Sequence, residues 1–161
     1  MEIYVFRHGV AADAKPGQDD AMRKLTLDGK RKLRQILALA RDVGVRPDVV
    51  LSSPYRRALE TAQMARGMLD LRPSIIETRI LIPLERPEAV WEEIRSHQDA
   101  KQVMIVGHEP QLSSVVGYLI GAPGASVDLK KGAIARVDVD LAGPRPTGVL
   151  VWLLTAKLAG A

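Results

Sequence analysis

Short apolar segments alternate along the chain with stretches in which apolar residues recur every three or four positions. The apolar segments predict strands at 2–6, 48–51, 74–77 and 102–106. The recurring apolar positions predict helices at 28–43, 57–69, 90–94 and 112–119. Strands that alternate with helices in this way are typical of an α/β layer fold.

The last part of the chain has a different pattern. Apolar residues dominate 133–139 and 149–155, and the segment 142–148 between them contains glycine and proline. This pattern predicts a β-hairpin. Because no repeat, low-complexity stretch or linker divides the sequence, we expect a single domain over residues 1–161.

The composition excludes several kinds of site. The chain has no cysteine, which excludes a disulfide framework, cysteine-based metal sites and thiol catalysis. Its three histidines leave little room for a histidine metal cluster, so we expect neither a metal nor another cofactor. Aromatic residues make up 4% of the chain, which disfavours stacking on single-stranded nucleic acid.

Charge and hydropathy indicate where the protein acts. The net charge of +4 suits an anionic ligand or an acidic partner, but it falls well short of a nucleic-acid-binding arm. The longest apolar run, 149–154, is too short to cross a bilayer, and the N-terminal segment does not resemble a signal peptide. We therefore expect a cytoplasmic monomer with no nucleic-acid or membrane partner.

Two of the three histidines come directly after predicted strands. His8 lies in Arg7-His8-Gly9 after the first strand, and His108 follows Gly107 after the strand 102–106. The ligand crevice of an open α/β sheet lies at the carboxyl ends of its strands, so we expect both histidines to reach one pocket. This pair is the first candidate for catalysis.

Anion-binding groups are predicted at the same edge of the sheet. Arg56 and Arg57 follow the strand 48–51 closely, and a guanidinium can clamp a phosphate with two hydrogen bonds. The helix that starts near Pro110 is expected to point free backbone N–H groups at the same anion. The sequence therefore predicts a phosphate site beside two histidines.

These segments resemble the motifs of the histidine phosphatase superfamily, branch 1, also called phosphoglycerate mutase-like. The family's Arg-His-Gly is present as residues 7–9, its Ser-x-x-x-Arg-Ala-x-x-Thr as residues 53–61, and its Gly-His as residues 107–108. The resemblance is closest to the short phosphohistidine phosphatases of the SixA type. It covers nearly the whole chain, including Leu25-Thr26-x-x-Gly29 before the first helix.

The resemblance implies a fold and a mechanism. The fold is a three-layer α/β/α arrangement with helices on both sides of a mostly parallel sheet. The residues implied in catalysis and phosphate binding are Arg7, His8, Arg57 and His108. His8 attacks phosphorus and carries the phosphoryl group until water removes it, and no metal is implied because the arginines supply the positive field. Ser53 and Thr61 are implied to support Arg57 and its helix.

The chain departs from the longer members of the family at three places. Where they have a serine, an asparagine and a catalytic glutamate, this chain has Ala11, Ala14 and the segment 81–83, which contains no acid. The nearest carboxylates are Glu85 and Glu88, and the sequence leaves open whether either reaches the site. A site without an acid suits phosphohistidine, because imidazole protonated on its other nitrogen leaves as a neutral group. We therefore expect rates that depend steeply on the leaving group.

The leading hypothesis is a phosphatase that acts on a histidine-phosphorylated signalling or transfer protein. The alternative within the same chemistry is a phosphatase or mutase for a small phosphate ester. A mutase needs groups that hold a substrate carboxylate, and it usually has capping insertions; this sequence shows neither. The alternative outside enzymes is a non-catalytic module that binds phosphoproteins, which would be expected to lose one of Arg7, His8, Arg57 and His108.

Overall fold

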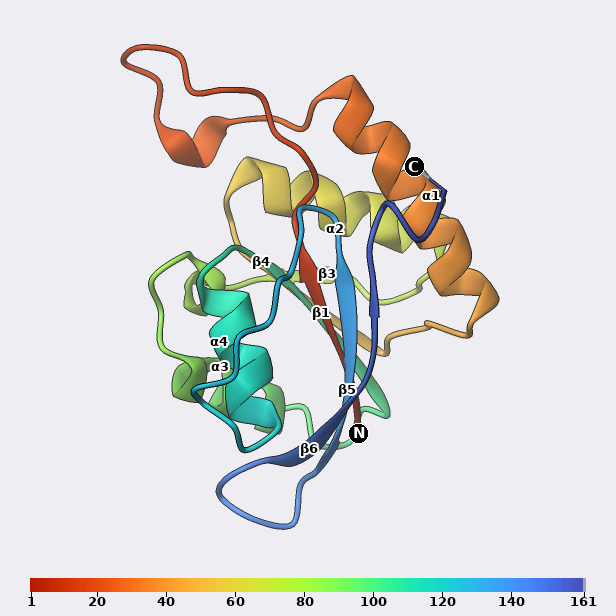
Figure 1. Ribbon diagram of the computed structural model, residues 1–161, viewed down its shortest axis with the longest axis vertical. Coiled ribbons are helices and arrows are strands. Elements are labelled where there is room, and N and C mark those ends of the chain that lie inside the picture. The colour runs from red at the N-terminus through yellow and green to blue at the C-terminus, as the bar shows by residue number, and fades with distance from the viewer. Residues whose placement is uncertain (161) are drawn as a thin grey trace.

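A six-stranded sheet forms the centre of the protein (Figure 1). The computed structural model describes residues 1–160. Its strands are β1 (Glu2–Arg7), β2 (Val49–Ser52), β3 (Ile75–Glu77), β4 (Gln102–Gly107), β5 (Ile134–Asp140) and β6 (Thr147–Leu154). Its helices are α1 (Leu27–Asp42), α2 (Arg56–Met68), α3 (Pro87–Arg95) and α4 (Gln111–Leu119), with the short 3-10 helices η1 (Asp20–Met22) and η2 (Arg79–Leu81).

The strands lie in the order β3-β2-β4-β1-β5-β6 across the sheet. Neighbours from β3 to β1 are parallel, whereas β5 is antiparallel to β1 and β6 is antiparallel to β5. The predicted mostly parallel sheet is confirmed, and its two antiparallel strands are the predicted C-terminal hairpin.

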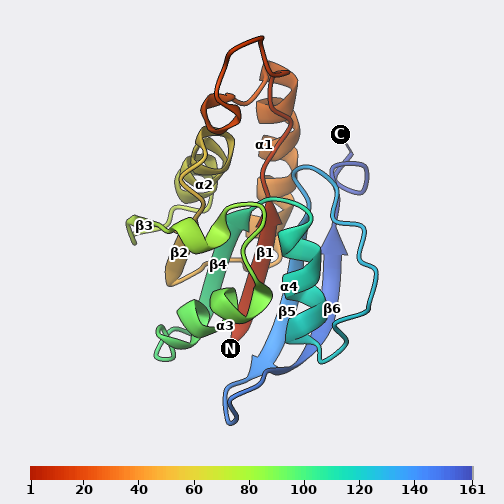
Figure 2. The same cartoon turned by 90° about the vertical axis from the view of Figure 1, so that its left-hand side faces the viewer.

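Helices cover both faces of the sheet (Figure 2). Side chains of α1 and α2 form one apolar core and those of α3 and α4 form the other, which confirms the three-layer α/β/α prediction. Alternate residues of β1 serve both cores: Ile3 and Val5 pack with α3 and α4, whereas Tyr4 and Phe6 pack with α1 and α2. A parallel strand buried on both faces is apolar throughout, which explains the continuous apolar segment that begins the chain.

The start of α1 is held against the segment that follows β1 by hydrogen bonds and close packing. The Thr26 hydroxyl caps the helix by accepting the Gly29 N–H at 2.9 Å, and it also contacts the Val10 carbonyl oxygen at 3.3 Å. A Cβ on Gly29 would lie 2.3 Å from that same oxygen, so only glycine permits this approach. The Leu25-Thr26-x-x-Gly29 motif thereby holds the chain just beyond His8.

Hydrogen bonds fix the two central strands in register where they end. Arg7 of β1 pairs with Gly107 of β4, and the N–H of His8 donates to the Gly107 carbonyl at 3.1 Å. His8 and His108 therefore leave the sheet side by side, with their ring centroids 5.0 Å apart. The predicted convergence of the two histidines is observed.

The largest difference from the sequence prediction lies between β1 and α1. The segment 13–24, for which the apolar pattern predicts no helix or strand, contains η1, and the Asp19 side chain caps it by accepting the Ala21 N–H at 2.9 Å. Most other element bounds differ from the predicted ones by one or two residues, although the helix predicted at 90–94 begins earlier, at Pro87. The short helix η1 matters for function because it carries Asp20.

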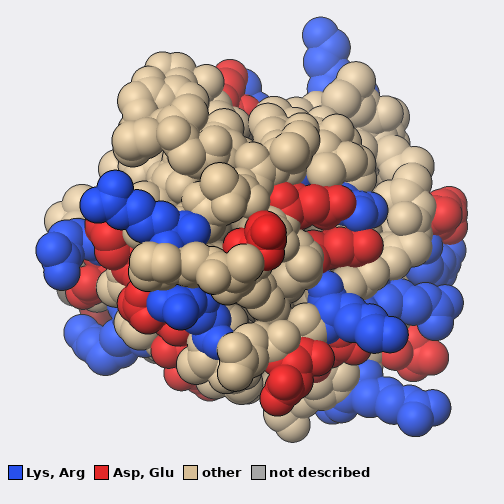
Figure 3. Space-filling view, turned by 90° about the horizontal axis from the view of Figure 1, so that it is seen from below, with Lys and Arg blue, Asp and Glu red and all other residues tan. Residues whose placement is uncertain are grey.

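Charged side chains lie over part of the end of the protein opposite the C-terminal ends of β1 and β4. On this face basic and acidic groups are intermixed (Figure 3). A face of mixed sign attracts a polyanion only weakly. Within residues 1–160, no helix has both the length and the apolar character to span a membrane.

Candidate active site

His8 lies at the floor of the site, with one ring nitrogen available for reaction. The ring is 6% exposed, and its Nδ1 is 2.7 Å from the Gly9 carbonyl oxygen. A carbonyl only accepts, so the proton is assigned to Nδ1 and Nε2 has a lone pair, which accepts a hydrogen bond from the Arg57 Nε at 3.2 Å. Burial lowers the pKa of His8 to about 3, and the charges of Arg57, Arg7 and Lys131 contribute, although the Gly9 hydrogen bond opposes this shift. The ring is therefore neutral at pH 7.

The peptide that orients His8 is itself held from two sides. A Cβ on Gly9 would lie 2.7 Å from Leu33 of α1, so a larger residue would separate this turn from the helix. The Gly9 N–H donates to the Thr61 hydroxyl at 3.2 Å, and that hydroxyl donates to the Arg57 carbonyl at 2.7 Å. Thr61 thus joins α2 to the His8 turn, in line with the supporting role expected of it.

Arg57 projects from the first turn of α2 into the same space. Its side chain is buried, and all three of its nitrogen atoms donate: Nε to His8, and the two terminal nitrogens to the Asp20 carbonyl at 2.7 Å and the Asp20 carboxylate at 2.9 Å. The guanidinium carbon also lies 5.2 Å from the centre of the Tyr55 ring. Arg57 is therefore fixed in place before any substrate arrives.

His108 presents a proton to the site. Its Nε2 is 2.9 Å from the Ser53 hydroxyl, which accepts the Tyr55 N–H at 3.3 Å. We assign the hydroxyl proton to the bond with Nε2, because no other acceptor among the described residues contacts this hydroxyl. The second nitrogen, Nδ1, then carries a proton, and it is buried without a hydrogen-bond partner among these residues. Burial, together with the nearby His8, Arg57 and Arg7, lowers the pKa of His108 to about 3, although the Asp20 carboxylate opposes this shift.

Ser53 makes the contact expected of it and one more. Its hydroxyl accepts the N–H of Tyr55, the residue that caps α2, so it supports the helix that carries Arg57. The same hydroxyl also contacts His108, which the sequence did not predict. It reaches this ring because Ser53 follows β2, the strand next to β4, and its N–H donates to the Val106 carbonyl of β4 at 2.9 Å.

Arg7 completes the set of donors. One terminal nitrogen donates to the Leu129 carbonyl at 2.8 Å, whereas Nε is buried with no partner among residues 1–160. Burial lowers the pKa of Arg7 from its usual value, although nearby acidic groups oppose this. Arg7 Nε and His108 Nδ1 are therefore two buried donors without partners, and the charge of Arg7 is close enough to lower the pKa of both His8 and His108. A buried donor without an acceptor is costly, and an anion that accepts from both relieves this cost.

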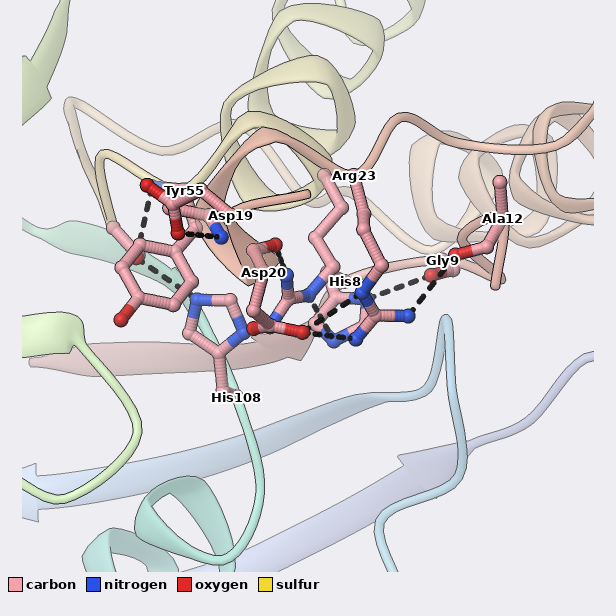
Figure 4. A network of polar contacts seen from close by, with 11 residues as sticks. His8, Gly9, Ala12, Asp19, Asp20, Arg23, Tyr55 and His108 are labelled. Carbon is pink, nitrogen blue, oxygen red and sulfur yellow. Dashed lines mark hydrogen bonds and ion pairs between the residues drawn. The ribbon is translucent and has the colours of Figure 1, made fainter. Parts of the chain in front are cut away.

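Asp20 is the site residue that the sequence did not predict. Its carboxylate reaches between Arg57 and Arg23 and lies close to His108 (Figure 4). Partial burial disfavours its charge, but hydrogen bonds from Arg57 and Arg23 outweigh this and hold the pKa of Asp20 below its ordinary value. The expectation of a site without a nearby carboxylate is thus corrected: a carboxylate comes from η1, whose position no periodic pattern in the sequence could give.

Neither carboxylate considered from the sequence is joined to the site. The Glu85 side chain is exposed, and only its backbone carbonyl is held, by the Gln111 amide at 3.1 Å. Glu88 lines a hollow together with Tyr118, at the far end of α4 from His108. A nine-residue helix is about 13 Å long, so Glu88 lies well away from the phosphate donors.

The backbone of α4 contributes less than expected. The N–H of Leu112 donates to the His108 carbonyl at 3.0 Å, and the N–H of Ser113 donates to the Glu109 carboxylate at 3.0 Å. These two groups at the start of the helix are already paired, so the prediction that its free N–H groups bind the anion is wrong for them. Within residues 1–160, no group of three or more His, Cys, Asp or Glu side chains is placed to hold a metal ion.

The sequence of this chain matches a known family. The model of the histidine phosphatase superfamily (branch 1) matches residues 3–80. An uncharacterised protein of Picosynechococcus is 33% identical over 144 residues, which cover 83% of this chain and 82% of that protein. The chain belongs to branch 1 of the histidine phosphatase superfamily.

This histidine phosphatase is similar to SixA proteins over almost its whole length. The phosphohistidine phosphatase SixA of Escherichia coli is 28% identical, in an alignment that covers 96% of this chain and 94% of that protein. The structure of a protein histidine phosphatase SixA complexed with tungstate has a TM-score of 0.87 and 26% identity, over 98% of both chains. The expected family and its SixA-like character are confirmed.

Two buried neutral histidines make this histidine phosphatase sensitive to acid. In the unfolded chain a histidine binds a proton below about pH 6.5, whereas His8 and His108 in the folded chain do so only near pH 3. The unfolded state therefore binds more protons between these values, and the free energy of unfolding falls as the pH is lowered through this window. Between pH 7 and pH 4.5 we expect about 2–3 kcal/mol of this loss from each histidine.

Urea unfolding at both pH values measures this loss. The variants His8→Gln and His108→Gln should each lose less stability on acidification than the wild type, because glutamine binds no proton. Equal losses in all three proteins would contradict the assignment of the two rings as buried and neutral.

Proposed function

We propose that this protein is a phosphatase that removes the phosphoryl group from phosphohistidine in another protein, through a covalent intermediate on His8. The observation that carries this proposal is the unprotonated Nε2 of His8 among donors that lack acceptors. His8 is the nucleophile, and Arg7 and His108 are the unpaired donors beside it. This combination suits a phosphoryl group, which needs one in-line nucleophile and several donors for its equatorial oxygens.

The reaction proceeds in two displacements. The lone pair of His8 Nε2 forms a bond to phosphorus, and the bond to the substrate's imidazole breaks with its electrons returning to that ring. Water then attacks phosphorus, and the electrons of the bond to His8 return to Nε2. Arg7, Arg57 and His108 stabilise the charge on the three equatorial oxygens in both transition states.

Hydrogen bonds in the free protein hold each of the two histidines with its proton on the nitrogen that these steps require. The Gly9 carbonyl holds the Nδ1 proton of His8, so the reacting nitrogen keeps its lone pair. Ser53 holds Nε2 of His108, so Nδ1 of that ring carries the proton that the phosphate accepts. No metal ion has a role in this mechanism, because two arginines and one histidine supply the donors.

The proposed substrate class rests on similarity to SixA. A phosphohistidine phosphatase of that name matches 96% of this chain, and a SixA structure is complexed with tungstate, a tetrahedral oxyanion like phosphate. The competing hypotheses are a phosphatase for a small phosphate ester and a module that binds phosphoproteins without turnover.

A comparison of rates tests the substrate class. With a chelator present throughout, kcat/KM should be highest for a histidine-phosphorylated protein and lower for phosphotyrosine, phosphoserine and sugar phosphates. Fastest turnover of a sugar phosphate would identify a small-molecule phosphatase, and binding of the phosphoprotein without turnover would identify a binding module. Loss of activity that returns with added metal would contradict the mechanism.

A further inference from the structure

The mouth of the site is formed by an element that belongs to neither the sheet nor the main helices. After β1 the chain runs outward through 12–19 and returns as η1, which places Asp20 above the two histidines (Figure 4). One oxygen of the Asp20 carboxylate is 2.9 Å from an Arg57 terminal nitrogen, and the other is 2.8 Å from the Arg23 Nε. Its side chain is 54% exposed, whereas that of Arg57 is 5% exposed. Asp20 therefore lies between the buried floor and solvent.

Asp20 lies on the side of the site from which the leaving group must depart. In an in-line displacement the leaving group departs on the side of phosphorus opposite the nucleophile. The nucleophile, His8, is buried at the floor, so the opposite side is the mouth. Asp20 lies at that mouth and contacts a guanidinium that also contacts His8. Within the described residues, the neighbouring carboxylates Glu85 and Glu88 make no contact with this guanidinium.

We propose that Asp20 is a catalytic residue that gives its proton to the leaving group and then takes a proton from the attacking water. This proposal rests on the proposed phosphatase function and assigns a further residue to the same site.

The hydrogen bonds of Arg57 can switch Asp20 between a charged carboxylate and a protonated carboxyl. In the free protein both terminal nitrogens of Arg57 donate to Asp20, to its carbonyl and to its carboxylate. A bound phosphoryl group accepts these donors instead and releases the carboxylate. The charges that face Asp20 are then the phosphoryl group, Arg57 and Arg23, above His8 and His108. An anionic phosphoryl group in contact favours the protonated carboxyl, which is the form that donates.

Atoms, electrons and protons balance in both displacements. In the first, His8 Nε2 bonds to phosphorus, the bond to the leaving atom breaks with both electrons on that atom, and the Asp20 proton moves to it. In the second, water gives one proton to the Asp20 carboxylate while its oxygen bonds to phosphorus. The electrons of the N–P bond return to His8, and inorganic phosphate leaves. When phosphate leaves, Asp20 returns this proton to solvent and pairs with Arg57 again, and it takes one proton from solvent each time a substrate binds.

A matched pair of variants separates this role from a structural one. Asp20→Asn removes the proton donor but keeps the size of the side chain. Asp19→Asn is the control: Asp19 is the adjacent residue, its side chain caps η1, and asparagine can still accept the Ala21 N–H. The two substrates are phenyl phosphate and 4-nitrophenyl phosphate, because 4-nitrophenolate leaves readily without a proton and phenolate does not.

The expected result is a loss that depends on the leaving group. Asp20→Asn should lower kcat/KM for phenyl phosphate by about 10²-fold or more, and for 4-nitrophenyl phosphate by less than about tenfold. Asp19→Asn should leave both values unchanged. Calorimetric titration with vanadate should show that Asp20→Asn binds this anion at least as tightly as the wild type, because the competing carboxylate is gone.

Other outcomes overturn the proposal in distinguishable ways. If the wild type is active and Asp20→Asn slows both esters equally, or accelerates both, Asp20 is no proton donor and the proposed function stands. If Asp20→Asn weakens vanadate binding in step with activity, Asp20 acts only by holding Arg57. If the wild type hydrolyses neither ester nor phosphohistidine, the proposed function and the role of Asp20 fail together.

Discussion

Replacing His8 by alanine is expected to abolish turnover and to remove the covalent phosphate from the protein. The structure leaves Nε2 of this ring unprotonated and surrounded by donors, so the phosphoryl group should bond to this atom. Loss of a nucleophile typically costs about 10⁴-fold or more in rate. Brief reaction of the wild type with a labelled phosphohistidine substrate, followed by rapid denaturation, should give a label that is lost in acid and stable in base.

Two further variants make the assignment specific. His97→Ala removes the third histidine of the chain, which lies after α3 with its Nε2 3.6 Å from the Glu93 carboxylate, and it should be labelled like the wild type. His108→Ala should react slowly but still carry its label on His8. A label that resists acid, or that persists in His8→Ala, would show that another residue is the nucleophile.

Arg57→Ala is expected to lower kcat/KM by about 10²–10³-fold, whereas Arg56→Ala should change it little. Adjacent residues of a helix point about 100° apart, so only one of the two faces the site. Arg57 is buried and contacts His8, whereas the Arg56 side chain is 41% exposed and pairs with Glu60 on the same helix. Removal of Arg57 takes away a charged donor to the transition state and also the group that holds His8 in position.

The comparison requires that both variants fold. Removal of the exposed Arg56–Glu60 pair should cost less than about 1 kcal/mol of the free energy of unfolding. Circular dichroism and urea unfolding measure this directly. Similar losses of activity in two folded variants would show that the motif of residues 53–61 does not place Arg57 in the site.

Most of the fold could be predicted because its buried strands have a simple pattern. β1 and β4 are covered on both faces, so nearly every position is apolar and the strands are visible without any knowledge of their neighbours. The hairpin of β5 and β6 was visible from its glycine- and proline-containing turn. The helix η1 was missed because three residues are too few to show a periodicity, and its place depends on contacts with α2.

The candidate site, like the fold, could be predicted only in part. Arg7, His8, Arg57 and His108 were placed together from their motifs and strand ends, and their catalytic roles stay predictions for the variants above to test. The additional contact of Ser53 with His108 was not predicted, because the order of β2 and β4 in the sheet is not visible in the sequence. Asp20 was missed because its contact with Arg57 joins residues 37 positions apart through a loop.

The pairing of Arg7 with Gly107 has a consequence for the divergence of this protein from its relatives. A slip of one residue between β1 and β4 would turn one of the two site histidines to the opposite side of the sheet, so we expect insertions and deletions within these strands to abolish activity. The exposed segment 13–18 has no such register to keep, since it runs between elements at the surface. Changes of its length would leave the two histidines in place and would move only η1, and with it Asp20.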